Sequence, residues 1–74
     1  MAEKKFNKGT EEWMMFVDFW NICQKNWLVE NSDSYWANII ADAHEFHDKY
    51  KDIPLAKNMI LSFVKTQEEL AKNK

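Results

Sequence analysis

The sequence predicts an all-α protein: a three-helix bundle in up-down-up order, completed by homo-oligomerisation. Three segments of the 74-residue chain repeat apolar residues at steps of three and four, the spacing of one helical face. The breaks between these segments are short, so neighbouring helices should run roughly antiparallel. No segment alternates apolar and polar residues as a half-buried strand would. We expect one domain over residues 10–72, preceded by a flexible arm over residues 1–9.

The first expected helix begins after Thr10, a residue type that serves well as an N-cap. Glu11 and Glu12 would then lie in the first turn, where the positive end of the helix dipole favours them. The apolar region of this helix runs from Trp13 to Val29, and twelve of its seventeen residues are apolar. A helix that is apolar nearly all round is usually buried on more than one side.

Two rows of apolar residues run along this first expected helix. We expect the other two helices to cover the first row, whereas the second row has no evident partner within the chain. The second row is therefore predicted to be the interface with another copy or another protein, because aromatic residues and Met are enriched in interface cores. Two alternatives stay open: all of these side chains are core, or some form a ligand pocket. The first row comprises Trp13, Phe16, Val17, Trp20, Cys23 and Trp27, and the second comprises Met15, Phe19 and Ile22.

The second and third expected helices are separated by a proline. Ser32 or Asp33 is the predicted N-cap of the second helix. Pro54 fits the first turn of the third helix, where its missing N–H would have no partner, so Asp52 or Ile53 precedes that helix. The residues expected to face inward are Trp36, Ile39, Ile40, Ala43, Phe46, His47 and Tyr50 in the second helix, and Leu55, Ala56, Met59, Ile60, Phe63, Val64 and Leu70 in the third.

Composition argues against several classes of function. The net charge is −2 and all ten basic residues are lysines, so the arginine forks that read guanine and phosphate are missing, and we expect no specific DNA binding. The longest apolar run, Trp13 to Val17, is far shorter than the roughly 20 residues of a membrane span. No apolar stretch follows the N-terminal lysines as in a signal peptide. We predict a cytoplasmic protein that does not bind membranes, and Cys23 has no second cysteine for a disulfide.

One cluster resembles a metal site, at His44, His47 and Asp48. Metalloproteases place two histidines at i and i+4, and the spacing here is one residue shorter. We interpret His47 as a semi-buried core residue and His44 as a surface residue. Gly9 is the only glycine, which excludes a glycine-rich phosphate loop, and no nucleophile or acid–base set stands out. We therefore predict a protein that is not an enzyme and has no cofactor and no metal.

A pocket for a nucleotide-type ligand is the alternative function. Trp27, Tyr35 and Trp36 flank the polar loop between the first two helices, and flat aromatic rings stack on bases. Lys25 and Lys57 are the candidate partners for the phosphates. In this alternative the protein sequesters a nucleotide-type immune signal.

Three stretches of packing and capping residues carry a resemblance to a known class of protein. On them, the chain resembles the small helical accessory proteins of phages and prophages of low-GC Gram-positive bacteria. The resemblance implies a protein that acts by binding in the host cytoplasm, where it inhibits or modulates a host defence protein, and it implies no catalytic residues. The stretches are Phe19-Trp20 followed by Trp27, Ser32-Asp33-Ser34-Tyr35-Trp36, and Ala56-Lys57-x-Met59-Ile60-x-x-Phe63-Val64.

Overall fold

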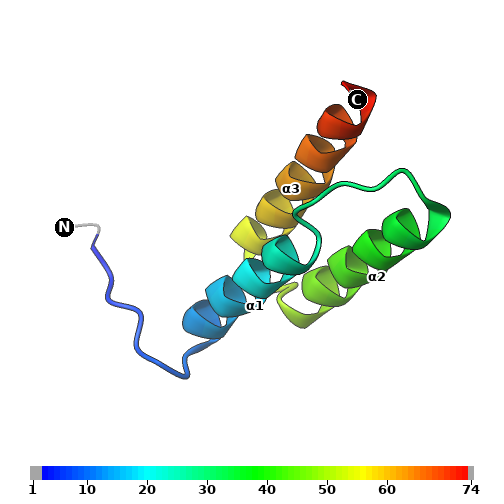
Figure 1. The fold of residues 1–74 in the computed structure, drawn as a ribbon. Helices are drawn as coiled ribbons and strands as arrows, with labels where there is room; N and C mark the ends of the chain where they lie inside the picture. The colour runs from blue at the N-terminus through cyan, green and yellow to red at the C-terminus, as the bar shows by residue number, and fades with distance from the viewer. Residues whose placement is uncertain (1–2, 74) are drawn as a thin grey trace.

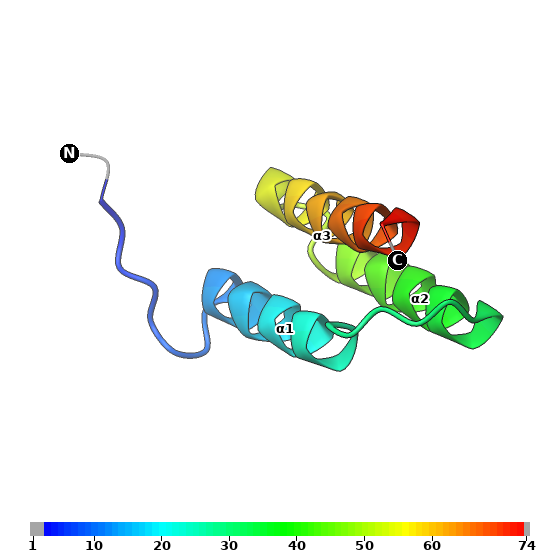
Figure 2. The same cartoon turned by 45° about the horizontal axis from the view of Figure 1, so that its top comes forward.

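The computed structural model describes residues 3–73, which form three α-helices and no strand. These are α1 (Glu11–Lys25), α2 (Asp33–Lys49) and α3 (Pro54–Lys72), so the predicted all-α class is confirmed. Along the chain, α1 and α3 run in the same direction and α2 runs in the opposite one (Figures 1 and 2). The helices α2 and α3 pack most extensively on each other, and α1 lies against both. Of the predicted arm, residues 3–9 are not helical, and residues 1 and 2 lie outside the described residues.

The predicted start of α1 is confirmed, but its end comes earlier than the apolar pattern suggests. The Thr10 side chain accepts a hydrogen bond from the backbone N–H of Trp13 and thereby caps the helix. The helix stops at Lys25, and Asn26 is its C-cap. The side-chain amide of Asn26 donates to the carbonyl of Ile22 at 3.0 Å, which satisfies a carbonyl group at the helix end. Residues 27–29 therefore belong to the connection to α2.

The starts of α2 and α3 follow the capping rules. Ser32 is the N-cap of α2, and its hydroxyl accepts from the backbone N–H of Tyr35 at 3.2 Å. Ile53 precedes α3, and Pro54 occupies its first position, where a missing N–H has no consequence. For each helix the sequence left two candidates for the N-cap, and the structure has Ser32 at the start of α2 and Ile53 at the start of α3.

The core lies between the three helices, and the predicted inward faces of α2 and α3 are mostly but not entirely right. Ile40, His47, Leu55 and Leu70 were expected to face inward, and all four are exposed. Each lies at the margin of its apolar stripe, and each helix buries only the part of the stripe that meets its two neighbours. The fully buried members of the core include Met15, Ile39, Phe46, Tyr50, Ala56, Ile60 and Phe63.

The two apolar rows of α1 are exchanged relative to the prediction. Met15 is 1% exposed and packs with core residues of α2 and α3, while Phe19 and Ile22 pack against the same core. The prediction that this row lacks a partner within the chain is therefore wrong. The row expected to be core is the open one, since Trp20 and Trp27 are each 64% exposed.

Polar anchors explain this rotation of α1. Asn26 lies four residues after Ile22 and eleven after Met15, so the three side chains share one face of the helical spiral. The Asn26 side chain is buried and donates to Asp42 of α2 at 3.1 Å. On the other edge of the same face, Asp18 accepts a hydrogen bond from the Tyr50 hydroxyl. Both anchors turn Met15 and Ile22 toward α2 and α3.

Candidate functional site

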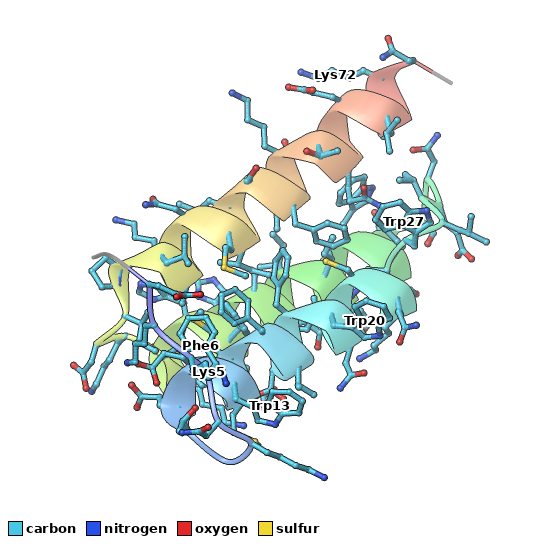
Figure 3. All side chains as sticks on the ribbon, turned by 90° about the vertical axis from the view of Figure 1, so that its left-hand side faces the viewer. Lys5, Phe6, Trp13, Trp20, Trp27 and Lys72 are labelled. Atoms are coloured by element: carbon cyan, nitrogen blue, oxygen red, sulfur yellow. The ribbon has the colours of Figure 1, made fainter. Side chains whose placement is uncertain are left out.

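The open side of α1 carries a row of aromatic residues, which we call the aromatic face. Its members are Trp13, Phe16, Trp20, Cys23 and Trp27, at alternating steps of three and four. Trp13 and Trp20 are seven residues apart, close to two helical turns, so they line up along one side of α1, and Trp27 follows at the same spacing in the connection after the helix. Figure 3 shows the three indoles following one another along α1 and into the connection after it.

The surface over the aromatic face is hollowed and uncharged. A shallow hollow of about 710 Å³ lies over Phe16, Trp20, Cys23 and Trp27, and Phe19 and Gln24 also line it. A second hollow, of about 440 Å³, continues it toward Trp13 and shares Phe16 and Trp20. No charged side chain of the described residues lines either hollow. The face therefore presents one continuous apolar strip.

The exposed area of the aromatic face is large for so small a chain. A tryptophan buries up to about 250 Å², so at 64% exposure Trp20 and Trp27 each leave about 160 Å² in water. The largest apolar patch on a typical monomer is about 300–600 Å² and is often functional. These two indoles alone reach the lower end of that range, and Phe16 adds to them. Apolar patches larger than this range mark protein–protein, membrane or ligand-binding sites.

Residues 3–9 fold back over the beginning of this face. The Phe6 ring lies 5.4 Å from the Phe16 ring, centroid to centroid, and Lys4 forms an ion pair with Glu12. The chain then bends at Gly9, whose φ of 94° lies in the left-handed region that favours glycine. The segment covers the N-terminal end of the aromatic face, and Trp20 and Trp27 remain bare.

A buried hydrogen-bond network holds the other end of the face in place. The Gln67 side-chain amide donates to the backbone carbonyls of Asn26 and Trp27, both at 2.9 Å. The Tyr35 hydroxyl donates to the same Asn26 carbonyl at 2.7 Å. The Trp27 ring also stacks on Phe63, with 6.4 Å between centroids and 20° between planes. The backbone at Trp27 is therefore fixed by α2 and α3, although its indole is exposed.

Sequence reasoning did not identify this network. Gln67 is 2% exposed, and it lies four residues after Phe63 on the inward face of α3. A polar residue at an inward position of an apolar stripe is the signal that could have revealed it. Buried polar groups need partners, so Gln67 predicts backbone acceptors close by.

The third side of α1 is polar and pairs with α2. Asp18 accepts hydrogen bonds from the Tyr50 hydroxyl and from the Lys49 ammonium, the latter at 2.9 Å. Burial by itself would raise the pKa of Asp18, but the hydrogen bonds from Tyr50 and Lys49 outweigh it, so the pKa lies below its ordinary value. Burial and donation to Asp18 raise the pKa of Tyr50. This side also includes an ion pair between Lys25 and Asp42.

The five residues of the predicted nucleotide pocket do not form one site. Tyr35 is buried, its hydroxyl is engaged in the network, and the Trp36 ring lies nearly perpendicular to its ring, with 4.8 Å between centroids. Lys25 is paired with Asp42. Lys57 lies ten residues before Gln67 on α3, which is about 15 Å along the helix from the turn that contacts Trp27. Tyr35 is only 8% exposed, so its ring has little free surface on which a base could stack.

The two histidines are both on the surface. His44 and His47 are exposed, so the prediction of a semi-buried His47 is wrong. Over residues 3–73, no three His, Cys, Asp or Glu side chains come together as a metal site would require. Cys23 is half-buried, and burial raises the pKa of its thiol.

Comparison with known proteins finds no match for this chain. No model of a protein family matches the chain, and no curated protein or solved structure matches it. The resemblance to phage accessory proteins therefore stays a prediction. Among the described residues, none of the helices is both long enough and apolar enough to cross a bilayer.

Proposed function

We propose that this chain is a non-enzymatic binding protein that self-associates through the aromatic face of α1. In this proposal two copies pack their aromatic faces together, and the resulting homodimer completes the three-helix bundle and binds a protein of the host cell. The observation that carries the proposal is the pair Trp20 and Trp27, each 64% exposed on one uncharged strip.

Three properties of the aromatic face support a second copy as its occupant. A two-fold interface brings one patch against itself, so the patch must carry no net charge of its own, and the hollows over this face have no charged lining. Trp13 and Trp20 have the seven-residue spacing along which two helices pack at a shallow angle, and Trp27 extends the apolar strip beyond the end of α1. An antiparallel pair of α1 helices would also bring opposite dipole ends together.

The accessible surface of the chain supports the same proposal. A compact monomer of 8.9 kDa exposes about 4,800 Å², whereas this chain exposes 5,810 Å². The extended segment before α1 and the bare aromatic face both add to the excess. A standard interface buries about 800 Å² on each partner, so the exposed rings of the aromatic face would form the apolar centre of such an interface and side chains around them would supply the rest.

The test is the solution mass as a function of concentration, measured by sedimentation equilibrium. We expect a mass near twice 8.9 kDa for the wild type at high concentration. Trp20→Glu should be monomeric, because each interface would then bury two unpaired carboxylates. The matched control is Leu61→Glu, which puts the same charge at an exposed apolar position outside the aromatic face and should still dimerise. A wild type that stays monomeric throughout would refute the proposal.

A further inference from the structure

A second apolar surface lies between α2 and α3. A groove of about 230 Å³ has the buried side chains of Ile60 and Val64 at its floor, and the more exposed Ile40, Ala43 and Leu61 form its apolar walls. Ile40 is 44% exposed and Leu61 is 55% exposed. No residue of α1 lines the groove, so the aromatic face could be covered by a second copy while the groove stays open.

The polar residues that line this groove are all basic residue types. His44, His47 and Lys57 are its only polar residues, and no acid lines it, although the whole chain has more acids than lysines. Over residues 3–73, none of these three side chains forms a hydrogen bond or an ion pair. All three can donate hydrogen bonds to a carboxylate. The groove therefore has unused donors and a lysine charge beside an apolar floor.

The donors gather at one end of the groove. His47 lies in the last turn of α2 and Lys57 in the first turns of α3, so both are near the turn that joins these helices. Ile40 and Val64 lie toward the opposite end. A ligand that fits this pattern is apolar along its length and acidic at one end.

The dimensions of the groove favour a helix as the ligand. From Ile40 to His47 on α2, and from Lys57 to Val64 on α3, the lining spans seven residue steps, or about 10 Å of helix. Apolar anchors at i, i+3 or i+4, and i+7 of a docked helix cover the same length. Pockets for drug-sized small molecules usually enclose about 300–1,000 Å³, and this open groove is smaller.

We propose that the groove between α2 and α3 binds an amphipathic helix of a partner protein, with apolar anchors on Ile40 and Leu61 and acidic residues at the end that meets Lys57 and His47. The inference deepens the proposed function and rests on it in one respect, because it supplies the surface by which the homodimer binds its protein target. The two grooves of one dimer would bind a partner that carries two such helices more tightly than a single groove would.

The test uses two synthetic helical peptides of about four turns, with identical leucine anchors and with either glutamates or lysines in the terminal turn. Binding to the full chain is measured by fluorescence anisotropy of a dye on the peptide. We expect the glutamate peptide to bind and the lysine peptide to bind about fivefold more weakly, since one exposed charge pair contributes up to roughly that factor. Lys57→Glu should reverse the preference.

Two further variants separate this inference from the proposed dimer. Leu61→Asp should weaken the glutamate peptide about tenfold by placing a charge on the apolar wall, and it should leave the dimer mass unchanged. Trp20→Glu should abolish the dimer and still bind the peptide through each groove. Circular dichroism of each variant checks that the helices are intact.

Several outcomes would overturn the inference. Equal binding of the two peptides would show that the lysine and the histidines do not select an acid. Wild-type affinity in Leu61→Asp would show that the peptide lies elsewhere. A third outcome is that the glutamate peptide binds without becoming helical and that decanoate displaces it from the groove. That result would assign the groove to a small carboxylate amphiphile instead.

Discussion

Two rows of apolar side chains run along α1, and they have opposite environments. Met15 is 1% exposed between α2 and α3, whereas Trp20, on the other row, leaves 64% of its surface in water. Both rows are apolar and both have helical spacing, so neither property decides which one is buried. The polar anchors beside the buried row decide it. The hydrogen bonds of Asn26 and Asp18 to α2 hold Met15 and its row inward.

Truncation on the two rows should give the largest difference in stability. Met15→Ala should lower the free energy of unfolding by about 2–5 kcal/mol, because it removes a buried side chain and leaves a cavity. Trp20→Ala should change it by no more than about 0.5 kcal/mol in the monomer, since it removes an exposed side chain. Urea unfolding at low protein concentration measures both. Equal losses would mean that the aromatic face is covered within the chain.

The network that fixes the end of the aromatic face should give the next largest effect. Gln67→Leu keeps the side-chain volume but leaves the Trp27 carbonyl without the amide that donates to it. We expect a loss of about 2 kcal/mol, within the range for an unsatisfied buried group. The control is Gln24→Leu, which makes the same change at an exposed glutamine. Measured at the same low protein concentration, it should leave the free energy of unfolding nearly unchanged. A loss of the same size in both variants would show that the network does not stabilise the connection.

The anchor between α1 and α2 should contribute less. Tyr50→Phe removes the hydroxyl that donates to Asp18 and should cost about 1 kcal/mol at neutral pH. Because the pKa of Asp18 is lowered in the folded state, its contribution is fully present above its ordinary value near 3.8 and is lost as the pH falls through the folded value. The difference between wild type and Tyr50→Phe should therefore shrink on acidification. Denaturant titrations at neutral and acidic pH measure it, and a difference that grows at low pH would contradict this assignment.

The segment before α1 should have the smallest effect. Phe6→Ala removes the ring contact with Phe16, and both rings are partly in water, so we expect a loss of about 0.5 kcal/mol. The exchange of amide hydrogens at the start of α1 should speed up while the core amides stay protected. Unchanged exchange at Trp13 and its neighbours would mean that the segment does not hold the helix start.

Much of the helical structure could be predicted because its determinants are local. The caps at Thr10 and Ser32 act on backbone groups three residues away, and Pro54 acts through its own ring. For the candidate site, the sequence predicted an apolar surface on α1 but not which residues form it. The surplus of apolar surface on α1 was evident from the sequence, but Met15, Phe19 and Ile22 were assigned to the wrong side of it.

The sequence by itself determined three helices, the Thr10 cap of the first, the caps of the other two to within one residue, and an excess of aromatic residues on the first helix. Only the tertiary structure decided how α1 is rotated, and hence that Trp20 and Trp27 are the exposed residues. The physical reason is the reach of the interactions. Helical spacing and caps act within about one turn, whereas the rotation depends on hydrogen bonds between residues 32 apart, at Asp18 and Tyr50, and 41 apart, at Asn26 and Gln67. No local pattern encodes which of two apolar rows such contacts will turn inward.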